Sequence, residues 1–337
     1  MSYSRFSVQN TVTRALMAAV FIAAALTFQT QKSHAEETMR AAVLKFGTVS
    51  WLMDVIKHHK LDKKENFNLE LVTLIGPQAA QVALLSGNAD TSVTDWFWVL
   101  HQRSLGANFT FVPYSVALGS LIVPADSPIK TIADLKGKRI GIAGSPIDKS
   151  WLLLRAYSKK TGSGDLAESA KLIFAAPPLL NEQLRAGRVD AVLNNWNLTA
   201  SLEAEGYRRI ASVAELMKEF DIPTPLPLLG FVVSEKFAAA KPKVLQGFAN
   251  AMQNAQKLLL TSDAEWDRIR PLTQAGSDAE FKVLRERYRE GLLHTWSERD
   301  RKAAGRLFDL MAETGGEQLT GKGVKFDPGI FWNGLVF

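Results

Sequence analysis

In the first part of the chain, short apolar runs alternate with stretches in which apolar residues recur every three or four positions. Short apolar runs indicate buried strands, and the longer spacing indicates amphipathic helices. Turn residues mark the boundaries, such as Gly76-Pro77 before one helix and Gly87 after it. The pattern predicts strands over 41–49, 67–74 and 89–94, and helices over 51–59, 77–85 and 96–103.

A second series of the same kind begins after Pro124. Three prolines interrupt 221–227, so we expect an irregular connection there, and the chain after Pro242 has a helical pattern up to Thr314. The predicted elements are strands over 138–143, 171–175, 188–193 and 228–234, and helices over 146–160 and 179–186.

The alternation of strands and helices indicates the fold class. It is typical of a mostly parallel sheet that helices cover on both faces. A chain of 337 residues suits two domains of common size better than one. We therefore expect an α/β protein with two lobes.

Two segments that lie one hundred residues apart are similar. Residues 84–90 lead through a strand to Asp95-Trp96, and residues 184–190 lead through a strand to Asn195-Trp196. Two related halves would explain this pattern, and so would coincidence, because Gly-x-x-Asp is frequent in α/β folds. We expect the aspartates that open the two strands, Asp90 and Asp190, to be turn residues.

The first 35 residues have the pattern of a secretory signal peptide. Arg5 and Arg14 give a positive start, an apolar run covers 15–28, and Ser33 and Ala35 are the small residues of a cleavage site. The apolar run is shorter than the roughly 20 residues that a membrane-spanning helix needs. We expect cleavage near Ala35 and a periplasmic mature chain that is not inserted in the membrane.

Charge and cysteine content restrict the partners. The whole chain has 40 basic and 34 acidic residues, but removal of the leader leaves 37 basic residues and no basic block that suggests nucleic acid. The chain has no cysteine, which excludes disulfides, thiolate metal sites, a cysteine nucleophile and a lipid-modified cysteine.

Candidate site residues lie on the loops that follow the predicted strands, because ligands of open α/β sheets bind beyond the carboxyl ends of the strands. Aromatic faces with a few fixed polar groups are typical of small-molecule sites. The candidates on these loops are Trp51, Asp95, Trp96, Trp98, Asp148, Asn195 and Trp196.

Several of these candidates also have a structural interpretation. Ser145 can cap a helix that begins at Pro146, with Asp148 completing a capping box, or the free N–H groups there can bind an anion and Asp148 a cation. Three consecutive aromatics cannot share one helix face, so we expect Trp96 or Trp98 to stack on a flat or cationic ligand. Trp51 and Trp196 suit the core or the cleft equally.

Other chemistries have little support. His58-His59 lies between lysines without an acidic partner, so we expect no metal site. Residues 137–144 lack the spacing of a phosphate-binding loop, and the sequence has no evident Ser-His-Asp set. We predict neither catalysis nor a cofactor.

The chain resembles the solute-binding proteins of ABC importers for nitrate, taurine, alkanesulfonates and thiamine-pyrimidine precursors. The resemblance covers about 40–260, and the segments that carry it are 83–90, 132–142, 152–156, 184–191 and 203–208. It implies a type II-like periplasmic binding protein fold that works, as a monomer, with an ABC permease and its ATPase.

The resemblance also implies lobe boundaries. Lobe 1 would comprise 40–121 and, on the chain's return, 228–337, and lobe 2 would comprise 122–227. Hinges would lie near 119–121 and 225–229, where Gly119 and Gly230 could absorb rotation. The family's ligand contacts come from loops that hold, in this chain, Ser50, Trp51, Gln78, Asp95, Ser145, Asp148 and Asn195.

The predicted function is capture of a small organic solute between two closing lobes. Residues 95–98 are acidic and aromatic where family members often have small residues, and Lys149 is the one basic residue on the candidate loops. These differences favour an amine-bearing, zwitterionic or heteroaromatic solute over a simple oxyanion. The alternatives are an accessory protein that docks on a partner such as a secreted dehydrogenase, and an enzyme of the same fold, although the related enzymes depend on cysteine.

Overall fold

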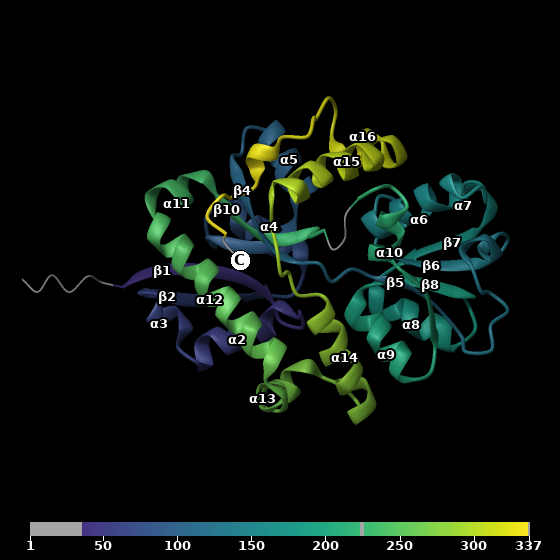
Figure 1. Ribbon diagram of the computed structural model, residues 1–337, viewed down its shortest axis with the longest axis horizontal. Coiled ribbons are helices and arrows are strands. Elements are labelled where there is room, and N and C mark those ends of the chain that lie inside the picture. The colour runs from purple at the N-terminus through teal and green to yellow at the C-terminus, as the bar shows by residue number, and fades with distance from the viewer. Residues whose placement is uncertain (1–35, 223–225, 336–337) are drawn as a thin grey trace, which may run out of the picture. The chain divides into compact units, whose positions relative to one another are not determined.

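The computed structural model describes residues 36–222 and 226–335. The predicted leader, 1–35, lies outside the described residues. Two mixed five-stranded sheets, each flanked by helices, organise the described chain (Figure 1). This architecture confirms the predicted two-lobe α/β fold.

The first sheet combines parallel and antiparallel pairs. β3 pairs in parallel with β1 and antiparallel with β10, and β10 pairs antiparallel with β4 on its other side. In order across the sheet, the strands are β2 (Phe67–Leu74), β1 (Glu37–Leu44), β3 (Thr91–Asp95), β10 (Leu229–Ser234) and β4 (Phe109–Ser115).

The second sheet has the same plan. β6 pairs in parallel with β7 and β8, and β5 pairs antiparallel with β8 and β9. In order across the sheet, the strands are β7 (Lys171–Ala175), β6 (Arg139–Ala143), β8 (Ala191–Asn194), β5 (Ser120–Val123) and β9 (Arg208–Ser212).

The fourth strand of each sheet comes from a distant part of the chain. β5 precedes the other strands of the second sheet, and β10 follows all of them. The chain therefore passes between the sheets through 116–119, and it returns in the segment between β9 and β10, of which 223–225 lie outside the described residues. The predicted second hinge falls in this latter segment, and its Pro225 lies outside the described residues.

The two glycines proposed as hinge residues lie where the backbone is closely packed. A Cβ on Gly119 would overlap the carbonyl oxygen of Asn194, and a Cβ on Gly230 would overlap the backbone of Val112 and the ring of Phe111. Gly230 lies inside β10 with a strand paired on each side. The role of the two glycines as hinge residues stays a prediction.

Helices cover both sheets. Those that accompany the first sheet are α2 (Val49–His58), α3 (Leu61–Lys64), α4 (Pro77–Leu85), α5 (Trp96–Ser104), α11 (Glu235–Ala240), α12 (Pro242–Thr261) and α13 (Asp263–Thr273). Those that accompany the second sheet are the short 3₁₀ helix η1 (Ile132–Leu135) and α6 (Lys149–Lys160), α7 (Leu166–Ser169), α8 (Pro177–Arg185), α9 (Trp196–Ala204) and α10 (Val213–Lys218).

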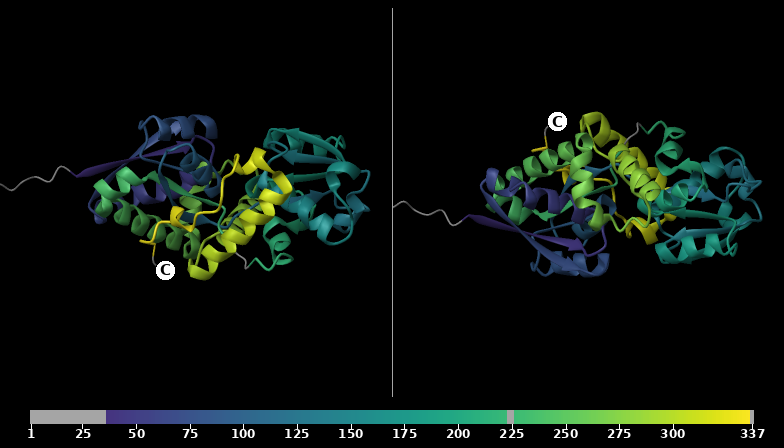
Figure 2. Two further views of the ribbon diagram at one scale, coloured as in Figure 1. Left: turned by 90° about the horizontal axis from the view of Figure 1, so that it is seen from above. Right: turned by 90° about the horizontal axis from the view of Figure 1, so that it is seen from below.

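The C-terminal helices contact both lobes. α14 (Asp278–Glu290) packs against α9, and α15 (Glu298–Gly315) packs against α6 and against α16 (Glu317–Thr320), which contacts α5. A short 3₁₀ helix, η2 (Pro328–Ile330), then lies beside β4. Figure 2 shows the yellow-green helices between the purple and the teal parts of the chain in both views.

One apolar core is shared between the lobes as a consequence. Trp96 and Phe97 of α5, Phe308 of α15 and Trp151 of α6 belong to a single cluster of buried side chains. Burial of large aromatic side chains is among the strongest contributions to stability. The described residues of α15 therefore stabilise both lobes at once.

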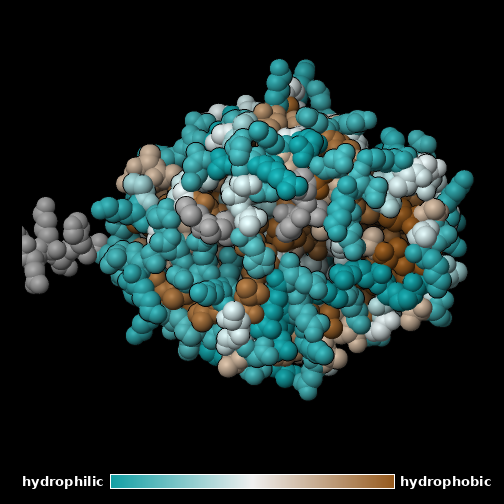
Figure 3. All heavy atoms as spheres, viewed as in Figure 1, coloured by the Kyte–Doolittle hydropathy of each residue, from teal (hydrophilic) through white to brown (hydrophobic). Residues whose placement is uncertain are grey.

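The face of the molecule that Figure 3 shows is mostly polar. Figure 3 shows hydrophilic side chains over most of one face, with separate apolar spots. None of the helices within 36–222 or 226–335 combines the length and apolar character that a bilayer crossing requires.

Most predicted elements are present, with differences at their ends. β2 and β7 have the predicted bounds. The predicted C-terminal helical region is interrupted at 291–297, between α14 and α15. The first strand was predicted over 41–49 but ends at Leu44, because the chain turns there and the Gly47 N–H donates to the Leu44 carbonyl. β4, β5 and β9 were not predicted.

Candidate ligand-binding site

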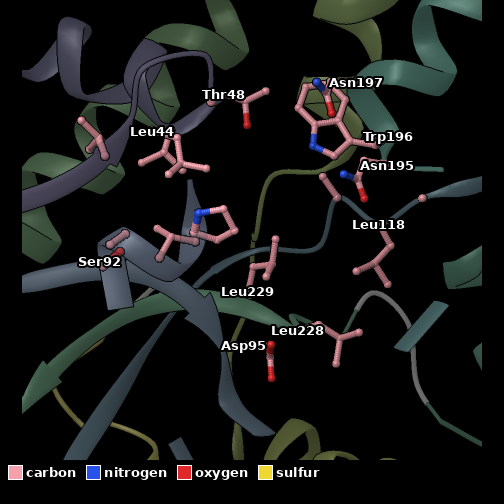
Figure 4. Close-up of a pocket in the computed structure, with 18 of the residues that line it drawn as sticks. Leu44, Thr48, Ser92, Asp95, Leu118, Asn195, Trp196, Asn197, Leu228 and Leu229 are labelled. Carbon is pink, nitrogen blue, oxygen red and sulfur yellow. The ribbon is translucent and has the colours of Figure 1, made fainter. Parts of the chain in front are cut away.

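A cavity of about 440 Å³ lies between the two sheets, where loops from both lobes meet. Its volume falls in the range of small-molecule sites. Figure 4 shows Leu44, Thr48 and Ser92 of the first lobe facing Asn195 and Trp196 of the second. Four of the ten predicted ligand residues line it, namely Asp95, Asp148, Asn195 and Trp196.

Matching ion pairs position the loops in the two halves. Asp90 accepts hydrogen bonds from the backbone N–H, Nε and Nη2 of Arg40 at 2.8–3.1 Å. Asp190 accepts the same three bonds from Arg139 at 2.6–3.2 Å. The hydrogen bond from the Arg139 side chain lowers the pKa of Asp190. The similarity seen in the sequence thus corresponds to one structural motif used twice.

Asp95 and Lys149 form an ion pair across the cavity. Asp95 caps α5 because its Oδ1 accepts the Trp98 N–H at 3.0 Å. Its Oδ2 accepts from the Lys149 Nζ at 2.9 Å, which joins the end of β3 to the start of α6. Burial lowers the pKa of Lys149, but the attraction and hydrogen bond of Asp95 outweigh it, so the net shift is upward. Lys149 is therefore held charged.

Asp148 is the cap of α6, so the prediction that Ser145 caps this helix is wrong. Asp148 Oδ1 accepts the Trp151 N–H at 3.1 Å, and the helix begins at Lys149. Residues 145–148 form a turn first, because the Asp148 N–H donates to the Ser145 carbonyl. Ser145 does not line the cavity.

The carboxyl group of Asp148 is electrostatically different from that of Asp95. Burial raises its pKa, and the Trp151 N–H and the Lys149 charge lower it only in part. Lys149 is already paired with Asp95. The cavity thus contains one carboxylate more than it contains ammonium groups, and Asp148 is the group left to be compensated.

Trp196 forms an aromatic edge of the cavity. It is the first residue of α9, and its indole meets Trp51 at 6.1 Å and Tyr288 at 6.0 Å between ring centroids, both edge-on. Within the described chain its Nε1–H has no hydrogen-bond partner. Figure 4 shows Trp196 and Asp95 on different sides of the pocket.

The other predicted tryptophans do not line the cavity. Trp96 is fully buried, stacks on Phe97 and donates from Nε1 to the Pro227 carbonyl at 3.2 Å. Trp98 is half-buried and packs against Phe109. The expected outward aromatic of this run is absent from the cavity because the shared core takes the side chains of α5.

Ser50, Trp51 and Gln78 also lie outside the lining, and the Ser50 hydroxyl donates to the Gly47 carbonyl instead. Trp51 is 4% exposed and donates from Nε1 to the Leu272 carbonyl, so it belongs to the core. Gln78 is exposed on the first turn of α4, and its neighbour Pro77 lines the cavity instead.

Several lining residues were not candidates from the sequence. Ser92 inside β3 is 3% exposed, and its hydroxyl has no hydrogen-bond partner in the described chain. Leu118, Leu228 and Leu229 lie on the segments that cross between the sheets, and Phe46 is an exposed aromatic at the edge. The segments that cross between the sheets carry no sequence motif for ligand contacts. Their location beside both sheets nevertheless indicates that they can line a site. The described residues contain no cluster of three metal-ligating side chains.

Two α/β lobes around a small solute-sized cavity define a two-lobe binding-protein fold. The chain belongs to the family described as NMT1/THI5 like, whose family model matches residues 63–265, more than half of the chain. No curated protein matches it in sequence.

Solved structures share the fold. The alkanesulfonate-binding protein SsuA of Xanthomonas axonopodis pv. citri, bound to MOPS, matches with a TM-score of 0.66 and 22% identity, over 88% of this chain and 98% of that one. The periplasmic aliphatic sulphonate binding protein SsuA of Escherichia coli matches with a TM-score of 0.69 and 18% identity, over 87% of this chain and 92% of that one. The desulfurization enzyme DSZB matches with a TM-score of 0.55 and 16% identity, over 86% of this chain and 96% of that one. At these identities the likeness establishes the fold alone.

Proposed function

We propose that the protein is the periplasmic solute-binding component of an ABC importer and that its solute is a small organic amine. Family membership and the fold shared with the SsuA proteins support the transport role. Capture by closure of the lobes, delivery to a permease with its ATPase, and export by the predicted leader complete the proposal.

The observation that carries the amine is the charge arrangement of the cavity. Asp95 compensates Lys149 at 2.9 Å, and burial raises the pKa of Asp148 because Lys149 offsets the cost of its charge only in part. A ligand ammonium placed beside Asp148 would compensate it, and a buried charge is stable only when it is paired and hydrogen-bonded. Leu118, Leu228 and Leu229 offer apolar contact to the rest of the solute.

The two predicted alternatives differ from this proposal in what they require. An enzyme such as DSZB shares the fold, but the described residues that line the cavity include no histidine and the chain has no cysteine. An accessory protein that docks on a secreted dehydrogenase would need no solute at all. A binding measurement therefore separates transport from docking.

The test is a thermal-shift screen of the purified protein against amines, zwitterions, sulfonates, pyrimidines and oxyanions. A ligand at 100 times its Kd should stabilise the protein by about 2.7 kcal/mol. Amines should give the shift, Asp148→Asn should reduce it to about a third at the same ligand concentration, and Asp309→Asn on the exposed face of α15 should keep it. A shift with oxyanions alone would refute the amine, and no shift with any class would favour the accessory role.

Delivery to a permease has its own test. Deletion of the gene should abolish uptake of the solute that the screen identifies, and restoring the gene should recover it. Uptake that continues unchanged in the deletion strain would contradict the transport role even if the purified protein binds that solute.

A further inference from the structure

Trp196 lies where three cavities adjoin. It lines the main cavity of about 440 Å³, an inner cavity of about 40 Å³ and a rear cavity of about 100 Å³. Ala117 on the crossing segment also lines all three. The indole of Trp196, as the largest shared side chain, is therefore a wall between spaces that would otherwise connect.

Lobe 1 holds this indole by its edges. Trp51 of α2 and Tyr288 of α14 meet it at 90° and 63° between ring planes, and no hydrogen bond fixes its Nε1–H within the described chain. The equivalent Trp96 is stacked, fully buried and hydrogen-bonded. Trp196 is thus the tryptophan of the repeated pair that faces open space and is free to contact a solute.

Two tyrosines, Tyr114 and Tyr288, are among the residues that line the inner cavity beside Trp196. Tyr114 and Tyr288 share one hydrogen bond at 3.4 Å, which uses the proton of one hydroxyl and leaves the other proton available. Burial raises the pKa of Tyr114 to about 12 and that of Tyr288 as well, so both remain neutral donors. A longer solute that passed Trp196 would meet a lining that combines apolar side chains with these tyrosines.

We propose that Trp196 limits the length of the solute. This inference rests on the proposed function, with the solute's ammonium at Asp148 and its body extending towards Trp196. The indole closes the main cavity at that end, so a chain that reaches beyond it would collide with the ring. Removal of the ring joins the inner and rear cavities to the main one and admits longer solutes.

The test uses straight-chain primary amines from ethylamine to octylamine, measured by titration calorimetry on wild type and on Trp196→Ala. Wild-type affinity should rise by about fourfold for each added methylene group until the chain reaches the ring, and then fall. In Trp196→Ala the maximum should move to a chain at least two methylene groups longer. If alanine lowers the yield of folded protein, Trp196→Leu should move the maximum in the same direction by less.

Two control variants separate size from other effects. Trp196→Phe retains a ring but lacks the indole N–H, so its maximum should lie within one methylene group of wild type. Trp98→Ala removes a half-buried tryptophan outside the cavity and should leave the profile unchanged. An unchanged profile in Trp196→Ala, with wild type binding amines, overturns this inference alone. Wild type that binds none of the amines overturns the proposed solute class and this inference with it.

Discussion

The two halves of the molecule share a framework and differ in what it carries. Their sheets have the same strand order, with an antiparallel strand from elsewhere in the chain at the fourth place. Arg40–Asp90 and Arg139–Asp190 form the same three hydrogen bonds. The repeated parts are those that fix the backbone, because an unsatisfied N–H at the start of a buried strand is costly wherever it occurs.

The differences lie at the equivalent positions that face the cavity. The first lobe has its acid at the start of α5, Asp95, and the second has Asn195 at that place. At the starts of α2 and α6 the acid lies in the other lobe: Thr48 precedes α2 in the first lobe, and Asp148 precedes α6 in the second. Each lobe thus contributes one carboxylate, from a different corner. A duplicated frame therefore forms an asymmetric site through substitutions at a few helix starts.

The equivalent tryptophans should differ most. Trp96→Ala removes a fully buried ring and a hydrogen bond and should lower the free energy of unfolding by about 3–5 kcal/mol. Trp196→Ala removes a half-buried ring without such a bond and should cost less than about 2 kcal/mol. Denaturant titration of both variants measures this. Equal losses would mean that the two positions are structurally equivalent after all.

The two capping acids should differ in ligand binding. Asp148→Asn keeps an oxygen that can cap α6 but removes the uncompensated charge, and amine affinity should fall by about 30-fold, which corresponds to about 2 kcal/mol. Asp95→Asn frees Lys149, so it should also weaken amines but should improve the affinity for anions. Calorimetry with one amine and one sulfonate distinguishes them. The same anion affinity in both variants would contradict the assigned charge arrangement.

The repeated ion pairs should stabilise the halves unequally. The Asp90 side chain is 14% exposed and that of Asp190 is 30% exposed. Asp90→Ala should therefore lower the free energy of unfolding by about 1.5 kcal/mol, and Asp190→Ala by about half of that. Both losses would be read from urea unfolding at neutral pH, with Asp309→Ala as an exposed control. A larger loss at Asp190 would reverse the comparison.

The smallest effect concerns pH. Asp148 faces Lys149 and Asp95, and burial raises its pKa, so on acidification it takes up a proton at a higher pH than an exposed aspartate does. A protonated Asp148 cannot compensate an ammonium, so amine affinity should decrease on acidification, by no more than about tenfold per pH unit. In the ligand-free protein, protonation of Asp148 on acidification removes the cost of burying its charge, so the free energy of unfolding should rise. Asp148→Asn should show a flat profile over this range, and a slope that persists there would implicate another group.

The sequence predicted the frame well because periodicity and turn residues are local signals. β2 and β7 were placed at their observed bounds, and the repeat led to Asp90 and Asp190. β5 and β10 were harder, since their fourth place in the sheets depends on pairing with distant strands. The capping of α6 was misassigned because Ser145-Pro146 has a strong local signal, whereas the tertiary structure begins the helix at Lys149.

Four of the ten predicted site residues line the cavity, and the reason is again the range of the signal. Asp95, Asp148 and Trp196 lie at helix starts, which strand–helix alternation identifies. Trp96 was drawn into a core shared with α15, a helix two hundred residues later in the chain, and no local pattern reports that packing. Ser92 and Leu118 line the site because the two sheets meet beside them, and no local sequence pattern indicates that arrangement.

The place of β10 in the first sheet has a consequence for biosynthesis. β3 and β4 are made early, but the strand that belongs between them ends at Ser234, after the whole second sheet has been made. Until then each has an unpaired edge, and exposed strand edges promote association with other chains. The first lobe can therefore be completed only after the second one, and a nascent chain stalled before Leu229 should be a substrate for a holding chaperone.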